Sequence, residues 1–119
     1  MCEVVQLKVT PDDTAQAMKS GDVPVLATAR LLSLIDEAAC GVVNPLLNAG
    51  QTTVGMRVQI DHLAPVNVGS TVRCDCTLER VEGRRLTFTA TVTDGSGLVA
   101  AGKVTRVIVD VDRFMEKAR

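Results

Sequence analysis

The chain contains a single histidine, His62, at the end of an alternating segment that runs from Thr52 to Pro65. Imidazole titrates closer to neutral pH than any other side chain, so it can serve as a general acid or base, or contact a polar ligand. The alternative is a partly buried or surface histidine whose hydrogen bond is purely structural. His62 is therefore the first candidate for acid–base or polar chemistry.

Polar residues of a predicted helix over residues 28–47 are the next candidates. Thr28 stands at the helix entry, where its hydroxyl either caps the first turn or takes part in chemistry. At about 100° per residue, Asp36 falls about 110° from the centre of the apolar stripe, on its flank, whereas Glu37 falls on the far side. Asp36 is then either a border residue of the buried interface or a surface carboxylate. Glu37 is predicted to face solvent or another subunit.

Two further features have both a structural and a functional interpretation. Gly55 lies inside a strand pattern, which indicates a bulge or a close approach of the backbone to a ligand. Arg84 and Arg85 occupy a hairpin tip, where arginines are usually solvated, and a phosphate-binding role is the alternative.

The four cysteines, Cys2, Cys40, Cys74 and Cys76, do not form a zinc pattern, because no second pair stands at zinc spacing and the histidine is remote. Cys74 and Cys76 alternate with Asp75 on one strand face among apolar residues. We therefore predict reduced cysteines, mostly in the core, and no metal site.

Composition limits the class of protein. The 119 residues, 46% of them hydrophobic and 23% charged, predict one globular domain over 1–119. A net charge of −1 offers no basic field for nucleic acid. The only aromatic residues, Phe88 and Phe114, argue against recognition of bases or sugars by stacking. Without a signal-peptide pattern or a membrane-length apolar run, we expect a cytoplasmic protein that binds no membrane.

The periodicity predicts the order of elements. A weak strand over 3–10 precedes a loop at 20–24 and the helix at 28–47, whose apolar stripe includes Leu31, Val42 and Leu46. Val54, Met56, Val58 and Ile60 are expected to share one strand face. A second strand holds the cysteine pair, and the turns at 82–85 and 94–97 lead into strands at 86–93 and 98–111. The threonines at 87–93 are predicted to face solvent, and 112–118 to form a short terminal helix.

One helix followed by four antiparallel strands predicts an α+β fold. A curled antiparallel sheet wrapped around one long central helix is the hot-dog arrangement. Such a sheet leaves an edge strand exposed, so we expect a dimer that extends the sheet.

Short motifs across nearly the whole chain resemble the fluoroacetyl-CoA thioesterase-like branch of the hot-dog superfamily. In chain order they are Val25-Leu26-Ala27-Thr28, Leu34-Ile35-Asp36-Glu37-Ala38-Ala39, Thr53-Val54-Gly55, Asp61-His62-Leu63-Ala64-Pro65, Val81-Glu82-Gly83-Arg84-Arg85-Leu86 and Arg106-Val107-Ile108-Val109-Asp110.

The resemblance implies a catalytic set of a helix-entry threonine, a helix carboxylate and a strand-end histidine, which correspond to Thr28, Asp36 and His62. It also implies that Gly55 lies near the thioester and contributes a backbone amide, and that members of the set come from different subunits. The chain departs from the family at Asp36, where the family typically has glutamate.

The implied activity is hydrolysis of a short or small acyl-CoA by a homodimer, or a tetramer, without a cofactor beyond the CoA of the substrate. Such a reaction needs an activated nucleophile and stabilisation of an oxyanion. A non-hydrolytic acyl-CoA-binding protein is the alternative that the aspartate keeps open. An enoyl-thioester hydratase is disfavoured, because the Asp-x4-His spacing of that branch is absent.

Overall fold

The computed structural model describes residues 1–118, so Arg119, the last residue of the predicted domain, lies outside the described part. The elements in chain order are β1 (Cys2–Lys8), the 3-10 turn η1 (Pro11–Asp13), α1 (Thr28–Val43), the 3-10 turn η2 (Asn44–Leu46), β2 (Gln51–His62), β3 (Thr71–Glu82), β4 (Arg85–Asp94), β5 (Gly97–Asp110) and α2 (Val111–Glu116).

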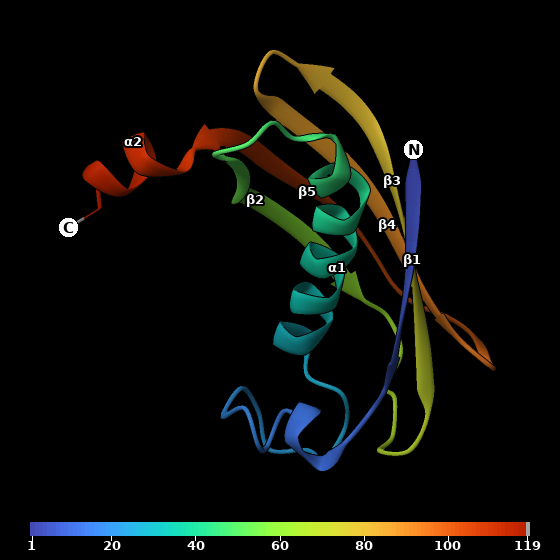
Figure 1. Cartoon of the computed structure of the whole chain (residues 1–119). Coiled ribbons are helices and arrows are strands. Elements are labelled where there is room, and N and C mark those ends of the chain that lie inside the picture. The colour runs from blue at the N-terminus through green and yellow to red at the C-terminus, as the bar shows by residue number, and fades with distance from the viewer. Residues whose placement is uncertain (119) are drawn as a thin grey trace.

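The five strands form one antiparallel sheet in the order β1-β3-β4-β5-β2, which curls around α1 (Figure 1). The predicted α+β hot-dog fold is confirmed. The consecutive strands β2 and β3 are not neighbours, because β2 pairs with β5 at one edge and β3 lies beside β1. The connection over 63–70 is too long for a tight hairpin and carries the chain across the sheet.

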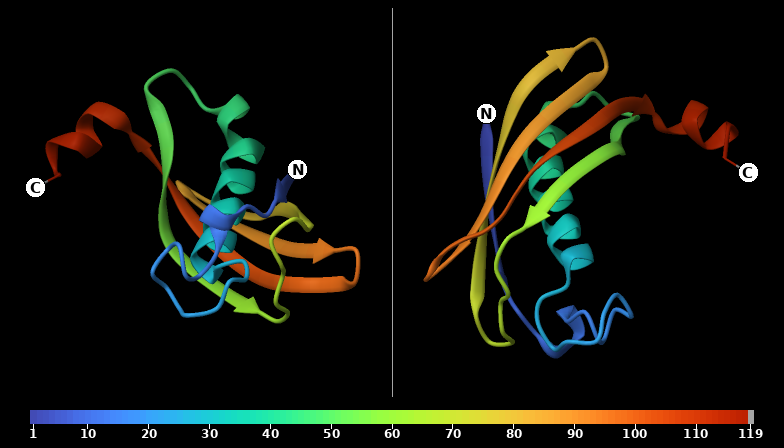
Figure 2. Two further views of the ribbon diagram at one scale, coloured as in Figure 1. Left: turned by 90° about the horizontal axis from the view of Figure 1, so that it is seen from below. Right: turned by 180° about the vertical axis from the view of Figure 1, so that it is seen from behind.

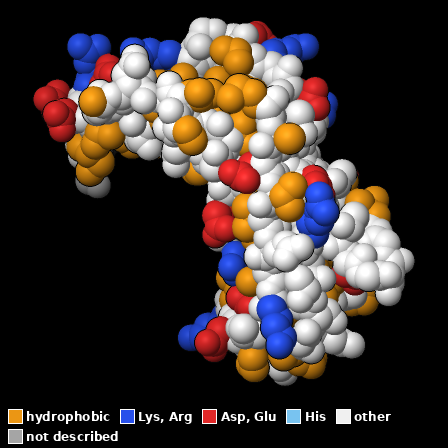
Figure 3. Space-filling model, turned by 45° about the vertical axis from the view of Figure 1, so that its right-hand side comes forward, with side chains coloured by type: hydrophobic (Ala, Val, Ile, Leu, Met, Phe, Trp, Pro, Cys, Tyr) orange, Lys and Arg blue, Asp and Glu red, His pale blue; other side chains and the backbone are white. Residues whose placement is uncertain are grey.

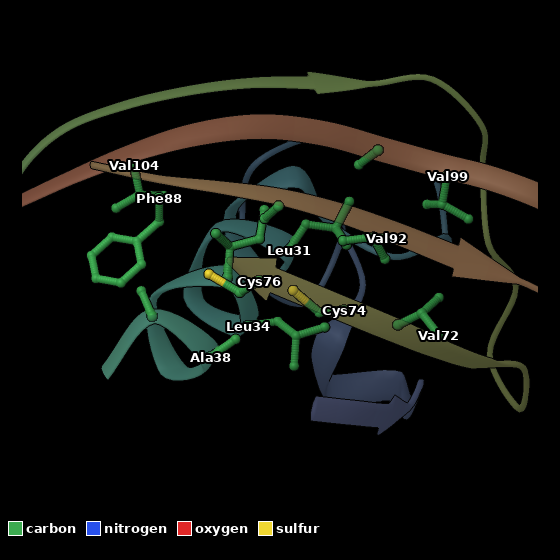
Figure 4. Packing of buried hydrophobic residues seen from close by; sticks show 14 of the residues in the cluster. Leu31, Leu34, Ala38, Val72, Cys74, Cys76, Phe88, Val92, Val99 and Val104 are labelled. Carbon is green, nitrogen blue, oxygen red and sulfur yellow. The ribbon is translucent and has the colours of Figure 1, made fainter. Parts of the chain in front are cut away.

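The core lies between α1 and the concave face of the sheet (Figure 4). Helix residues at three- and four-residue spacing, such as Leu31, Leu34 and Ala38, pack on sheet residues that include Phe88 and Val104, all of them fully buried or nearly so. Burial of aliphatic side chains on this scale is the main stabilising contribution to such a fold.

The helix ends earlier than predicted. Pro45 lacks an N–H and its ring clashes with the carbonyl of the preceding turn, so α1 stops at Val43 and the chain tightens into η2. Leu46, predicted to extend the apolar stripe, is consequently 60% exposed. That part of the prediction is wrong.

A β-bulge reverses the pattern of β2. The register with β5 shifts between Gly55 and Arg57, which leaves Met56 as the extra residue. Val58 and Ile60 pack against the core as predicted, whereas Met56 is 50% exposed. Val54 also lies on the other face, because its register partner Val107 stands between the inward-facing Arg106 and Ile108. The prediction that Val54 and Met56 share the face of Val58 and Ile60 is therefore wrong, because one inserted residue changes which side chains point inward. The bulge inferred from Gly55 is confirmed.

The alternation of β4 is close to the prediction. Leu86, Phe88, Ala90 and Val92 are buried, while the intervening threonines are exposed or half-buried on the convex face.

The short helix α2 follows the C-terminal end of β5 and projects away from the body of the molecule (Figure 2). No helix of the described residues is long and apolar enough to cross a membrane.

Gly102 is expected to be essential for stability. A Cβ at this position would collide with the carbonyl oxygen of Gln59 on the adjacent strand, so Gly102→Ala must displace backbone. We predict a loss of about 1–3 kcal/mol in the free energy of unfolding, measured by urea denaturation. Gly95→Ala is the matched control, because no atom lies within 4 Å of its Cβ. Equal stabilities of the two variants would contradict the prediction.

Candidate active site

Thr28 and His62 form a direct pair. The hydroxyl Oγ1 of Thr28 lies 2.7 Å from Nδ1 of His62, which joins the first residue of α1 to the last residue of β2. The helix N-cap is Ala27, and no side chain caps this end. The capping role considered for Thr28 is therefore not observed, and its hydroxyl bonds the imidazole.

The second ring nitrogen of His62 is buried without a partner. Within residues 1–118, Nε2 is the one buried side-chain nitrogen or oxygen that makes no hydrogen bond. Burying a polar atom unpaired costs free energy, so such atoms often mark positions where a ligand or another chain supplies the missing group. Because Thr28 holds Nδ1, Nε2 is the ring nitrogen that remains open to a further partner.

Asp36 binds a different partner. Its Oδ1 accepts a hydrogen bond of 2.9 Å from Nη1 of Arg106 on β5. Arg106 is buried, and it also donates through Nε to Oγ1 of Thr53 and through Nη2 to the carbonyl oxygen of Thr53, both at 2.9 Å. Three directed bonds therefore fix the guanidinium, which in turn fixes the carboxylate. Among the described residues, Oδ2 of Asp36 receives no hydrogen bond.

Gly55 lies beside this ion pair. It is the register partner of Arg106, and a Cβ at position 55 would stand 3.6 Å from Nη1, an ordinary van der Waals distance. The single chain thus leaves room for a side chain at Gly55. Its glycine is not required by packing within one protomer, which is consistent with a ligand or a second chain at this point.

The predicted site residues lie in two groups within one chain. Thr28 and His62 form the first group, and Asp36 with Gly55 and Arg106 forms the second. Thr28 and Asp36 are eight residues apart on α1, a separation of about 12 Å along the helix axis. Glu37 is exposed, as predicted.

Arg106 was not singled out by sequence reasoning, although it stands in a quoted motif. The available signal is its place in the strand alternation, because Val104, Arg106 and Ile108 share the inner face. A charged residue on a buried strand face needs a partner of opposite charge. That requirement points to a carboxylate on the facing helix.

A second missed contact positions the helix entry. Asp13 in η1 accepts hydrogen bonds from the backbone and hydroxyl of Thr10 and a 3.0 Å ion pair from Nε of Arg30. Burial alone would raise the pKa of Asp13, but these bonds outweigh it and hold the pKa below its ordinary value. The carbonyl of Asp13 also accepts from the N–H of Ala27, next to Thr28.

The cysteines lie outside both groups. Cys74 and Cys76 are buried in the core, and burial is the main cause that raises their thiol pKa values to about 12 and about 11; Asp36 contributes to the rise at Cys76. Such thiols stay protonated at neutral pH. Within the described residues no three His, Cys, Asp or Glu side chains converge as a metal site would need.

A shallow depression of about 200 Å³ beside His62 is lined by Val25, Leu63, Ala64 and Pro65.

The family model described as "Fluoroacetyl-CoA-specific thioesterase" matches residues 9–112. The chain belongs to this family. The fluoroacetyl-CoA thioesterase of Streptantibioticus cattleyicolor is 30% identical to it over 95 residues, which cover 80% of this chain and 68% of the relative.

Solved structures agree with the family assignment. A structure of the fluoroacetyl-CoA thioesterase FlK superposes with a TM-score of 0.95 at 25% identity and covers 100% of this chain and 93% of its own. A hot-dog-like protein from Thermanaerovibrio acidaminovorans superposes with a TM-score of 0.92 at 29% identity, over 98% of this chain and 87% of its own. The match extends over both groups of site residues.

Arg106 is predicted to stabilise this thioesterase-family fold as well as the site. Arg106→Ala leaves the Asp36 carboxylate and the buried oxygens of Thr53 without their donor, so we expect a loss of about 2–4 kcal/mol in the free energy of unfolding. The control is Arg73→Ala, which removes an exposed pair with Asp75 and should cost less than about 1 kcal/mol. The free energies of unfolding of both variants are measured by urea denaturation. Similar losses in the two variants would contradict a structural role for Arg106.

Proposed function

We propose that this protein hydrolyses an acyl-CoA thioester to the free acid and CoA. The observation that carries the proposal is the Thr28–His62 pair with its unpartnered Nε2, in a chain of the fluoroacetyl-CoA-specific thioesterase family. Water adds across the carbon–sulfur bond in this reaction. The acid takes the hydroxyl group, and the leaving thiolate takes a proton.

The residues of the two groups have complementary roles in that reaction. Asp36 acts through Oδ2 as general base on water or attacks the thioester carbonyl directly, while Arg106 holds its other oxygen. His62 protonates the leaving thiolate or orients the water through Nε2, and Thr28 keeps the ring in place. Backbone N–H groups at the Gly55 bulge stabilise the oxyanion.

The two groups meet in a homodimer that pairs the β2 edges. β2 is bonded on one side only, so its outer edge presents unpaired backbone groups. An antiparallel pairing with its two-fold axis at Gln59 sets Arg57 against Asp61 of the partner subunit, two opposite charges on the convex face. Because Met56 is the extra residue of the bulge, Gly55 then lies opposite His62 of the partner subunit.

This arrangement supplies what each chain lacks. It brings Asp36, Arg106 and Gly55 of one protomer to the unpartnered Nε2 of His62 from its partner. The side chain of Asp36 is one methylene shorter than that of glutamate. The guanidinium of Arg106, which Thr53 fixes, holds its carboxylate in position. A back-to-back pairing of two such dimers would give a tetramer.

Smaller observations support a short acyl group and a cytoplasmic compartment. The depression beside His62 is apolar and, at about 200 Å³, lies below the roughly 300–1,000 Å³ of sites for larger ligands, which favours a short acyl group. The four cysteines are free, as in a reducing cytoplasm.

Substitutions at the two groups test the activity. We expect His62→Ala and Asp36→Asn each to lower kcat/KM at least ~10²-fold on a panel of short acyl-CoA thioesters, because each removes an acid–base group. Glu37→Gln, a neighbouring and exposed carboxylate, is the control and should change little. Release of CoA is followed with a thiol reagent. Binding without turnover, unchanged by Asp36→Ala, would favour the acyl-CoA-binding alternative.

Mixed dimers test the shared site. Chains with His62→Ala and chains with Asp36→Asn are each expected to be inactive, yet co-expressed chains should recover about a quarter of wild-type activity. Half of the dimers are then mixed, and one of the two sites in each mixed dimer is intact. Activity that stays at the level of the single variants would place the Asp36 and His62 of each site in one protomer.

A further inference from the structure

We infer that Asp13 and Arg30 are positioning residues, which hold Thr28 at the distance from His62 that the reaction requires. Asp13 lies in η1 and Arg30 in the first turn of α1, and Nε of Arg30 lies 3.0 Å from Oδ1 of Asp13. Among the described residues neither side chain bonds Thr28 or His62, so both act through the backbone. The inference rests on the proposed function, since it assigns a role in the same site.

The start of α1 is not held by a cap of its own. The N-cap is Ala27, which has no side-chain oxygen to accept from the first N–H groups. The next residue, Thr28, bonds His62 with its hydroxyl. The first turn also lacks an acidic residue, which the positive end of the helix dipole would favour. The position of Thr28 therefore depends on contacts from outside the helix.

Arg30 is unfavourable for the helix that carries it. It is the third residue of α1, where the exposed N–H groups and the helix dipole oppose a cation. The carboxylate of Asp13 offsets this effect, because it is only 12% exposed and is also oriented by the N–H and hydroxyl of Thr10. On the face shown in Figure 3, charges of both signs lie next to one another at the lower end, where η1 and the start of α1 lie in Figure 1. This mixture favours a local ion pair over a surface that binds an anion.

Asp13 is attached to the helix entry at two points, one on each side of Thr28. Its carbonyl oxygen accepts a hydrogen bond of 2.9 Å from the N–H of Ala27, and its carboxylate binds Arg30. Thr28 lies between these two points in the chain. The backbone bond fixes the residue before Thr28, and the ion pair fixes the turn after it.

The segment before Thr28 is also attached to the chain that follows His62. The N–H of Leu26 donates to the carbonyl of Val66 at 2.9 Å, and Val66 comes four residues after His62. The segment thus bonds η1 on one side and the end of the β2 connection on the other. Loss of the Asp13 contacts would leave one attachment, and the distance from the Thr28 hydroxyl to Nδ1 would no longer be fixed.

Nitrogen NMR of the imidazole tests the positioning without any substrate. His62 is the single histidine, so its two ring nitrogens give signals that no other histidine overlaps. The Nδ1 shift depends on the hydrogen bond that this atom makes, and Thr28→Val supplies the value without the hydroxyl. We expect the Nδ1 shift of Arg30→Met and of Asp13→Asn to move most of the way to the Thr28→Val value.

The control for both measurements is Arg73→Met, which breaks an exposed ion pair with Asp75 and should keep the wild-type Nδ1 shift. The Asp13–Arg30 pair is itself partly exposed, so its loss leaves the chain folded. A wild-type Nδ1 shift in Arg30→Met and Asp13→Asn would overturn the inference, and so would an equal change in Arg73→Met.

Kinetics separate positioning from a general structural role. In Arg30→Met, kcat should fall ~10-fold, because a small displacement of a catalytic group slows the chemical step. KM should change less than ~2-fold, because neither positioning residue touches the substrate. Arg30→Lys retains the charge and should recover most of kcat. A loss that Arg30→Lys does not recover, or one that falls on KM instead, would contradict the inference. The expected Nδ1 shifts without hydrolysis of any thioester would retain the positioning of Thr28 and refute the proposed function.

Discussion

The buried guanidinium of Arg106 is the interaction on which the arrangement of this protein depends. Its three hydrogen bonds join β5 to Thr53 on the edge strand and to Asp36 on the central helix, so one side chain connects the three elements that carry the site. A buried arginine is stable only when its donors are satisfied. Its two bonds to Thr53 therefore restrain the register of β2, and its bond to Asp36 restrains the rotation of α1.

Strand β2 lies at the edge of the sheet, and its two ends carry residues of different groups. The bulge at Met56 turns Gly55 inward beside Arg106, and the far end of β2 carries His62 to the start of α1. Within one chain, the Thr28–His62 pair and the Asp36–Arg106 pair consequently stand apart along the helix. In the proposed dimer, the Nε2 of His62 that has no partner within residues 1–118, the unbonded edge of β2 and the space beside Gly55 all face the partner subunit.

Much of the fold could be predicted because its elements are encoded in short windows. The amphipathic spacing of α1, the alternation of β4 and the bulge at Gly55 depend on residues a few positions apart. The predicted end of α1 and the predicted inner face of β2 were wrong, because a proline and an inserted residue interrupted the repeating patterns. Pro45 ended the helix before Leu46, and the inserted Met56 turned its side chain away from the face of Val58 and Ile60.

By itself, the sequence determined the candidate side chains, the α+β class and the family motifs, because residue type and spacing carry that information. Only the tertiary structure decided which residues meet. It placed β2 beside β5 rather than β3, gave the Thr28 hydroxyl to His62 instead of the helix cap, and buried Arg106 against Asp36. These contacts join positions 34 and 70 residues apart, and such pairings are set by how the sheet curls around the helix, which no local pattern records.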